Sequence, residues 1–474
     1  MSLARGVWRP KSWGYPPKSA PVGSMVAARF DPVKIKQGQS LQRIRKEDKN
    51  LNNVTVHATT LVVDKSWRRL TNALSGQFCA SLNFLDATQT VSPAWSLRPS
   101  GVKAKSKNKG TDIDGEEESY FRFGTLPGEN VCTENLTPWK KLLPCEAKRG
   151  LATLLNARSI HTTKYHAIGL TLRTICPPHP SRSPNSCSDP VIELRQHVTL
   201  VFDPSSFREN VKRSRTREST IGHLHLDWSI QSLFGMGLNS RCPLAKHSRI
   251  YVNMLNNQVR EQSLFTVDPE TPSHEVEMLR HSGANGDLFT IRAYDLEHLL
   301  DQGIHNLHGR YDSAKYFEWS NLNQLGINGN GLNMISASRH QTGYGQERGG
   351  IVTTIRNSGG KELKVVLLDI IPWFLRVYLH SLKIETITSG KTALAKPLKT
   401  KFIPGIDRRK PYSMELLLSI PAQSVVRVSI GFEHSILKWH EYPPDANKGF
   451  YVGSALISAL IPTSHDNSTL GKNH

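Results

Sequence analysis

The residues with the clearest chemical potential in this chain are its six cysteines: Cys79, Cys132, Cys145, Cys176, Cys187 and Cys242. None belongs to a C-x-x-C pair, and their spacings suit neither a zinc site nor a thiol-redox motif. All of them precede residue 243, as expected of disulfides that staple one domain. Six cysteines permit three internal bridges, and the spacing leaves their pairing open. Disulfides would place the chain in an oxidising compartment.

A catalytic site would need a nucleophile, a base and an orienting group. The His308-Gly309 pair resembles the His-Gly of caspase- and legumain-type proteases, whose nucleophilic cysteine follows the histidine; here no cysteine follows Cys242. His223 and His225 have only Asp227 beside them, so a metal site lacks an assured third ligand. No G-x-S-x-G elbow, P-loop or dinucleotide fingerprint is present. The residues therefore predict a β-rich scaffold with no active site, metal or cofactor of its own.

Glycosylation sequons point toward a secretory lumen. Asn53-Val-Thr and Asn467-Ser-Thr are acceptor matches, whereas Pro138 directly after Asn135-Leu-Thr disfavours modification there. Residues 1–24 contain no apolar stretch of the signal-peptide type. No window approaches the roughly 18 apolar residues of a membrane span. The sequence as written thus predicts neither an export signal nor a membrane anchor.

The net charge is large for a chain of this size. The 474 residues carry a formal charge of +20, which raises the hypothesis of a nucleic-acid partner. The basic runs lie at 1–50, 208–217 and 391–410, in stretches poor in aromatic residues and rich in loop-forming ones. Single-strand binders interleave aromatic and basic residues. The pattern favours solvated loops, and no nucleic-acid partner is predicted.

Two stretches outside the strands have distinct patterns. Val131–Cys145 contains Pro138 and Pro144, which predict an extended or turn-like surface ribbon that carries two thiols. Asp64–Leu82 has large apolar residues at helical spacing, including Trp67 and Phe78, and predicts an amphipathic helix with Asp64 as its N-cap.

Strand patterns dominate the remainder. His166–Ile175 and Val191–Asp203 alternate apolar and polar residues and predict an antiparallel pair, joined by a loop that carries Cys176 and Cys187. Five further runs in the last third predict a sandwich with one buried face: Gly350–Arg356, Leu363–Asp369, Leu375–Ile387, Met414–Ile420 and Ser424–Phe432.

The predicted fold class is mainly β, an antiparallel β-sandwich architecture of two packed sandwich-like domains with a few short helices. Residues 1–60 form a largely irregular segment, 61–250 a first β-rich luminal domain with all the cysteines, 251–462 a second β-sandwich domain, and 463–474 a polar tail.

Several long strings occur in the same order as in one known family. The chain resembles the PIG-T family in GVWRPKSWGYPP (6–17), DKSWRRLTNALSGQFCASLNFLD (64–86), VCTENLTPWKKLLPC (131–145), CPLAKHSRIYV (242–252), TGYGQERGG (342–350), LLDIIPWFLRVYLHSL (367–382) and LKWHEYPPDANKGFYVGSALISALIP (437–462). The resemblance covers most of residues 61–462. Residues 25–60 match nothing expected of the family, and its signal peptide and membrane helix are absent from the sequence as given.

The resemblance implies a non-catalytic subunit of the glycosylphosphatidylinositol (GPI) transamidase, on the luminal side of the endoplasmic reticulum membrane. That complex replaces the C-terminal signal of a proprotein with a GPI lipid. Its catalysis belongs to a legumain-like cysteine protease subunit, and the PIG-T subunit holds that chain and contacts the other membrane subunits. The expected partners are therefore these subunits, with proprotein and GPI lipid as substrates of the complex.

The resemblance assigns a role to one cysteine. It implies an intersubunit disulfide to the catalytic subunit through Cys132. Five cysteines then remain, an odd number, and Cys79 in its apolar context is expected to be the free one. Cys176–Cys187 is the favoured internal bridge, and Cys145–Cys242 is a less favoured second bridge. Pairing of Cys132 with Cys145 stays open as the alternative. The alternative function is an independent luminal or secreted β-sandwich binding module, which would associate with no membrane complex.

Overall fold

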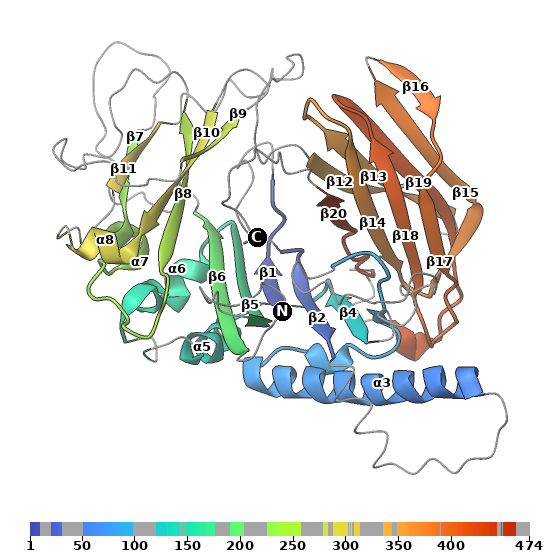
Figure 1. Ribbon diagram of the computed structural model, residues 1–474, viewed down its shortest axis with the longest axis horizontal. Helices are drawn as coiled ribbons and strands as arrows, with labels where there is room; N and C mark the ends of the chain where they lie inside the picture. The colour runs from blue at the N-terminus through green and yellow to red at the C-terminus, as the bar shows by residue number, and fades with distance from the viewer. Residues whose placement is uncertain are drawn as a thin grey trace, which may run out of the picture. The chain divides into compact units, whose positions relative to one another are not determined.

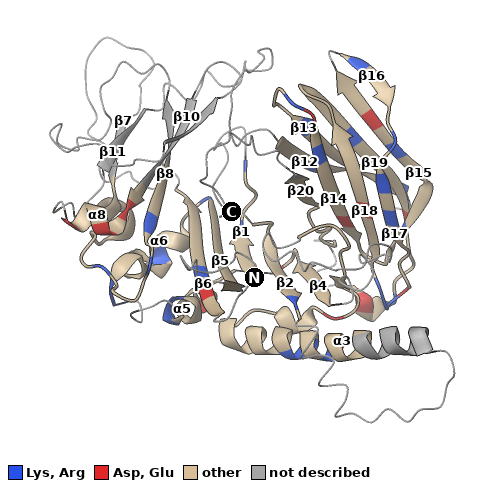
Figure 2. Cartoon of the chain, in the orientation of Figure 1, with Lys and Arg blue, Asp and Glu red and all other residues tan. Residues whose placement is uncertain are grey.

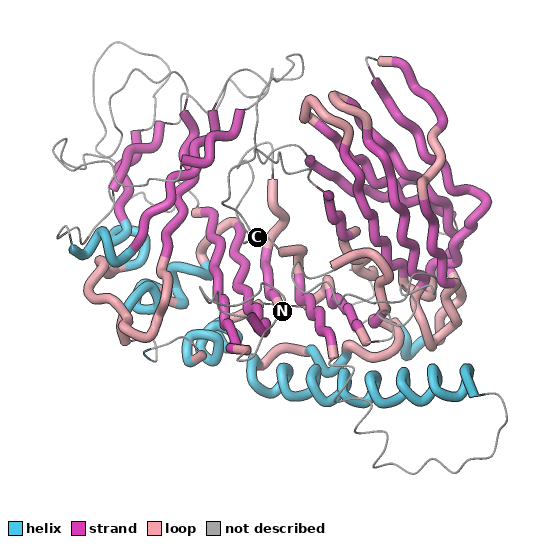
Figure 3. Tube along the Cα trace, in the orientation of Figure 1, coloured by secondary structure: helices cyan, strands magenta, loops and turns pink. Residues whose placement is uncertain are grey.

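The computed structural model describes residues 1–9, 20–30, 51–97, 120–129, 131–142, 145, 148–175, 190–202, 225–256, 278–282, 288–301, 303, 305, 308–312, 335–343, 348–388, 390–442, 447 and 449–460. For 51–59, 225–228, 253–256, 278–282, 288–293 and 308–312 it describes the backbone alone. Strands predominate and pair antiparallel, which confirms the predicted class (Figure 3). The chain divides into two compact units: residues 1–22 with 130–333 (unit 1), and residues 23–129 with 334–474 (unit 2).

Unit 1 is built from short sheets and short helices (Figure 1). Its strands are β1 (Ser2–Arg5), β5 (Tyr165–Ile175), β6 (Val191–Val201), β7 (His225–Ser229), β8 (Arg249–Asn256), β9 (Met278–Ser282), β10 (Leu288–Asp295) and β11 (His308–Asp312). Its helices are α5 (Thr133–Lys141), η3 (Gly150–Leu154), α6 (Ala157–His161), α7 (Ile230–Phe234) and α8 (Leu296–Asp301). Strand β5 pairs with β1 and β6, β10 pairs with β8 and β9, and β11 pairs with β7.

Strand β5 lies between β1 and β6 in unit 1. Its first residue, Tyr165, is fully buried, and its hydroxyl exchanges hydrogen bonds of 3.0 Å with both the N–H and the C=O of Ala20. The ring of Trp8 packs edge-on against Tyr165 with centroids 5.1 Å apart. These contacts fasten the N-terminal segment to β5. The predicted β5–β6 pair is confirmed, with His166 opposite Leu200 and Leu172 opposite Leu194.

Unit 2 contains a two-sheet sandwich and one long helix. Its elements are β2 (Gly23–Arg29), α3 (Leu51–Phe78), η1 (Leu82–Phe84), β3 (Thr90–Val91), β4 (Phe121–Leu126), β12 (Ile335–Thr342), β13 (Arg348–Asn357), β14 (Leu363–Ile371), β15 (Leu375–Thr388), β16 (Lys391–Leu394), β17 (Lys399–Ile403), β18 (Tyr412–Ile420), β19 (Ser424–His434), η6 (Trp439–Glu441) and β20 (Leu456–Leu460). One sheet has the order β12-β13-β19-β15-β16, and the other has the order β17-β18-β14-β20.

The sandwich core forms because alternate residues of both sheets point inward. Ile355 and Ile430 of one sheet and Val365 and Leu416 of the other are at most 3% exposed and belong to one cluster. On the same inward face of β14, Asp369 is 2% exposed. It forms an ion pair of 2.9 Å with Arg339 of β12, so one charged pair bridges the two sheets.

The outer face of the second sheet is also covered within unit 2. Leu368 of β14 packs in a cluster with Val91 and Phe123 of β3 and β4. The buried carboxylate of Glu415 accepts hydrogen bonds from the backbone N–H groups of Ala94, at 2.6 Å, and Ser96, at 2.9 Å. Backbone donors satisfy this charge, which keeps the segment before residue 98 against β18.

The structure corrects the predicted helix. It runs over Leu51–Phe78 rather than Asp64–Leu82, so Asp64 is a mid-helix residue and not an N-cap. Asp64 instead forms an ion pair of 2.7 Å with the buried guanidinium of Arg122. The predicted apolar face is confirmed at Trp67, 4% exposed, and Phe78, 1% exposed. With 28 residues, α3 is far longer than the short helices expected.

The structure also corrects the description of residues 1–60 as largely irregular. Strands β1 and β2 and the start of α3 lie in that range. Strand β1 has four residues and β2 consists mostly of small residues, so neither shows the alternation that identifies a strand. The two compact units do not follow the expected boundaries at residues 60 and 250, because the chain crosses between them near residues 22, 129 and 333. The 463–474 tail lies outside the described residues.

Candidate functional site: the helix that begins at Cys132

Cys132 is the N-cap residue of α5, and its side chain is exposed. Its backbone is extended, with φ −132° and ψ −179°, and its N–H donates to Oδ1 of Asn135 at 2.7 Å. Asn135 is 1% exposed. A third-residue side chain that reaches back to the N-cap N–H is the reciprocal half of a capping box. The thiol is therefore accessible at a point where the backbone is held in place.

The sheet of unit 1 holds this helix. Leu136 and Trp139 of α5 are each 3% exposed. Nε1 of Trp139 donates to the carbonyl of Gly169 on β5 at 3.2 Å, and Nε2 of Gln196 on β6 donates to the carbonyl of Trp139 at 2.9 Å. Helix α5 thus lies on the β5–β6 pair (Figure 1), and rigid elements position Cys132.

The prediction of an extended ribbon over Val131–Cys145 was wrong, because Thr133–Lys141 is an α-helix with Pro138 inside it. An interior proline costs about 3 kcal/mol, since its ring displaces a backbone hydrogen bond. Burying two large side chains, Leu136 and Trp139, contributes about 4 kcal/mol in return. The tertiary contact therefore outweighs the local cost.

The two lysines after Trp139, Lys140 and Lys141, have different surroundings. Trp139 is packed, and Nζ of Lys140 donates to the carbonyl of Leu155 at 2.7 Å. Burial lowers the pKa of Lys140. Lys141 is exposed. Leu136 and Trp139 anchor the helix that follows the thiol. Their spacing of three residues is a helical signal in the sequence that could have identified them.

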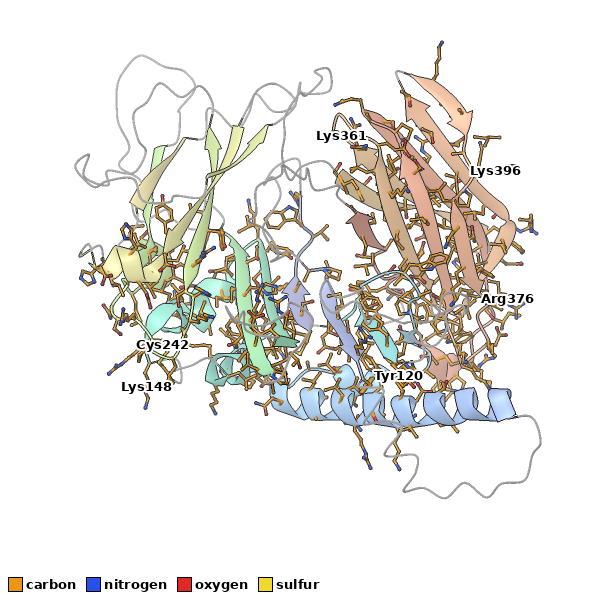
Figure 4. All side chains as sticks on the ribbon, in the orientation of Figure 1. Tyr120, Lys148, Cys242, Lys361, Arg376 and Lys396 are labelled. Atoms are coloured by element: carbon orange, nitrogen blue, oxygen red, sulfur yellow. A yellow bond between two sulfur atoms is a disulfide. The ribbon has the colours of Figure 1, made fainter. Side chains whose placement is uncertain are left out.

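Cys145 and Cys242 form a disulfide, with Cα atoms 5.9 Å apart and a sequence separation of 97. Cys132 is therefore not bonded to Cys145 in this structure. The bridge lies against Gly150, whose backbone φ of +73° favours glycine. A Cβ atom at this position would also lie only 3.3 Å from Cβ of Cys242. Figure 4 shows Cys242 close to the segment that carries Lys148. The disulfide closes the end of the Cys132 stretch onto the chain before β8.

The other predicted site residues lie either on α3, directly after it, or outside the described residues. Cys176, Cys187 and Asn467 lie outside the described residues. Asn53 is in the first turn of α3, and its side chain is outside the described part. Cys79 follows the last residue of α3 and is exposed.

Two histidine rings in unit 1 meet edge to face with centroids 4.9 Å apart: His161 of α6 and His166 of β5. His166 is 1% exposed. Burial, then the nearby His161 and Arg5, lower the pKa of His166 to about 4. Burial and Arg5 also lower the pKa of His161. Both shifts in pKa favour the neutral form of the imidazole.

Within the described ranges, no group of three or more His, Cys, Asp or Glu side chains is placed to hold a metal ion. Nor does any helix in that part of the chain combine the length and apolarity needed to cross a membrane. The charged groups of unit 2 are interleaved on the strands around β15 (Figure 2), where Glu385 pairs with Lys383 at 2.5 Å.

Comparison with known proteins gives one consistent answer. The family described as "Gpi16 subunit, GPI transamidase component" matches residues 1–472. The chain belongs to the Gpi16 family. It is 36% identical over 471 residues to the GPI-anchor transamidase component PIGT of Mus musculus, covering 98% of this chain and 67% of that protein. It is 34% identical over 464 residues to the protein of the same name in Homo sapiens, covering 98% and 68%.

A more distant relative agrees. The GPI transamidase component GPI16 of Saccharomyces cerevisiae is 28% identical over 407 residues, covering 83% of this chain and 62% of that protein. This Gpi16-family chain spans about two thirds of the length of the curated relatives that it matches. The resemblance in the sequence is thereby confirmed.

Proposed function

We propose that this chain is a non-catalytic scaffold subunit of a GPI transamidase on the luminal side of the endoplasmic reticulum membrane. Its relatives are named components of that enzyme, which supports membership of the same complex. The catalytic cysteine and histidine belong to a legumain-like protease subunit. The present chain holds that subunit and contacts the other membrane subunits, and the proprotein and GPI lipid are substrates of the assembled complex.

The observation that carries the proposal is the setting of Cys132. Its thiol is exposed, while Asn135 and Trp139 fix the helix that follows it. Cys145, the nearest alternative partner in sequence, is engaged with Cys242. Cys132 and a thiol of the catalytic subunit join by losing two protons and two electrons to a disulfide-exchange oxidant of the lumen. The bond fixes the partner's effective concentration.

The test is non-reducing electrophoresis of the complex co-expressed with its catalytic subunit. We expect an adduct of the two chains that disappears with reductant and with Cys132→Ser. The matched control is Cys79→Ser, which removes the other cysteine that is exposed within the described residues and should leave the adduct intact.

Persistence of the adduct in Cys132→Ser would refute the assignment of the tether. Failure of the unmodified chain to co-purify with any membrane subunit would instead favour the independent β-sandwich binding module. The two outcomes differ, because loss of the covalent bond alone leaves non-covalent association measurable.

A further inference from the structure

Two apolar side chains project into solvent from unit 2, just after strand β19. Ile436 is 90% exposed and Trp439 is 86% exposed, the two highest values among the large apolar residues that the structure describes. They lie three residues apart, and Trp439 begins η6. We call Ile436 and Trp439 the apolar tips. Large apolar side chains that gather at one exposed place mark a contact surface.

The segment that carries the apolar tips is fixed by Arg408. Nη2 of Arg408 donates to the carbonyl of Ile436 at 3.4 Å and to Oε2 of Glu441 at 3.0 Å. The N–H of Lys438 also donates to Oε2 of Glu441, at 2.7 Å. Hydrogen bonds from Arg408 and then from Lys438 lower the pKa of Glu441 to about 2. The guanidinium of Arg408 itself lies 5.1 Å from the ring centroid of Trp373. An ordered frame therefore presents the tips.

Packed aromatic rings form the base of this frame. The ring of Phe450 lies 4.7 Å from that of Phe374 and 6.1 Å from that of Tyr442, measured between centroids. The N–H of Ser435 donates to the carbonyl of Phe374 at 2.7 Å. Apolar partners are thus available beside the segment, yet the two tips point away from them into solvent.

Positive charge surrounds the apolar tips. Each carboxylate here is held by an arginine, Glu441 by Arg408 and Asp407 by Arg376, the latter pair at 3.3 Å (Figure 4). Three further cations on the same turn and segment are exposed: Arg409, Lys410 and Lys438. Five Lys or Arg side chains therefore stand against two carboxylates. The complementary surface is apolar where it meets the tips and negatively charged around them.

A bilayer surface fits this arrangement better than a folded protein does. Tryptophan is enriched where membranes meet water, because its ring is apolar and its N–H is polar. Lysine and arginine beside such a side chain strengthen binding to anionic lipid head groups. A protein interface instead gathers its apolar side chains in a core from which charge is depleted. Here Lys438 lies between Ile436 and Trp439 in the sequence, so charge and apolar tips alternate.

We propose that the apolar tips and the cations around them bind the head-group layer of an anionic lipid bilayer. The tips enter the boundary between head groups and acyl chains, and the cations contact lipid phosphates. The inference deepens the function proposed above and rests on it for placing this chain beside a membrane. It names the surface of unit 2 that contacts the lipid, and this contact needs no other subunit.

The test is flotation of the purified full chain with lipid vesicles. The chain should float with vesicles of phosphatidylcholine and phosphatidylinositol, and less with phosphatidylcholine alone or at high salt, which screens the cations. Trp439→Ala and Ile436→Asp should each lower the affinity for the anionic vesicles about tenfold, because each removes an apolar contact with the lipid. Arg409→Glu/Lys410→Glu should lower binding to the level on phosphatidylcholine alone.

The matched control is Leu394→Asp, which makes the same change of charge as Ile436→Asp at another exposed aliphatic side chain. Leu394 is 76% exposed on β16. It lies opposite Glu385, nine residues along β15 from Arg376, and Lys391 on the same strand supplies a nearby cation. This variant should bind the vesicles as the unmodified chain does. All substituted positions are exposed, and a thermal melt checks that each variant folds.

Failure of the unmodified chain to float with either kind of vesicle would overturn the proposal. So would an equal loss in Leu394→Asp, because binding would then follow net charge rather than the apolar tips. If Trp439→Ala keeps its vesicle binding but no longer co-purifies with a membrane subunit, a protein covers the tips and the bilayer contact is wrong. None of these outcomes depends on the Cys132 adduct, so the lipid contact and the proposed scaffold function can fail separately.

Discussion

The sandwich of unit 2 and the β5–β6 pair of unit 1 bury the same kind of apolar stripe in different ways. In the sandwich, inward residues such as Ile355 and Leu416 face each other from two sheets of one chain, and neither is exposed. In unit 1, one nine-residue helix covers Ile168 and leaves Leu172 in solvent. Alternation in a strand indicates that a face needs a cover, but it does not say which chain supplies it.

The two regions also differ in what holds them together. The sandwich has a large apolar cluster with one buried ion pair inside it. Unit 1 has smaller clusters, and a disulfide closes a long loop between them. We therefore expect covalent and local anchors to matter more in unit 1, and packing across the sheets to matter more in unit 2.

The largest expected effect is loss of the Cys145–Cys242 bridge. In the chain-entropy description, opening a loop of 97 residues costs about 4–5 kcal/mol of unfolding free energy. The Cys145→Ser/Cys242→Ser variant should speed hydrogen exchange in β5 and β6 and leave β14 and β18 unchanged. Equal acceleration in both units would show that the two regions do not differ in this way.

A smaller effect is expected from the ion pair inside the sandwich. Burial raises the pKa of Asp369, and the neighbouring Arg339 opposes that shift. Asp369→Ala leaves the guanidinium of Arg339 without its carboxylate and should lower the unfolding free energy of unit 2 by about 3–4 kcal/mol. Hydrogen exchange of β14 measures it.

The control for that variant is the double substitution Arg339→Met/Asp369→Leu, which removes both charges at similar volume. It should restore most of the lost stability, because an apolar pair can replace a buried ion pair. If the double variant is as unstable as Asp369→Ala, packing rather than the unpaired charge explains the loss.

The smallest effect is a pH dependence confined to unit 1. His166 titrates near 6.5 when unfolded and about 4 when folded, so the unfolded chain takes up its proton first as the pH falls. Stability that is complete above pH 6.5 should fall by about 2 kcal/mol between pH 7 and pH 5. Hydrogen exchange of β5 at several pH values measures this loss.

His166→Gln should flatten that pH dependence in β5 while β14 keeps its own. His161→Gln, at a partly exposed ring, should flatten it less. An unchanged slope in His166→Gln would mean that other groups cause the acid sensitivity of unit 1.

Much of the β architecture could be predicted, since it depends on neighbours along the chain. The strand pattern around β14, β18 and β19 and the antiparallel β5–β6 pair follow from apolar alternation between turns. The first strands could not be predicted in this way. Ser2–Arg5 is a strand because β5 pairs with it, and its four residues carry too little pattern to be recognised alone.

The stretch that begins at Cys132 shows which features follow from the sequence alone and which follow from the tertiary structure. By itself the sequence determined that the chain carries a family's VCTEN string, six cysteines and alternating strands, because these are properties of residue type and order. Only the tertiary structure decided that Pro138 stays in a helix, that Cys145 pairs with Cys242, and that burial stops at Leu172. Each of these depends on residues distant in sequence, whose contacts outweigh local preference.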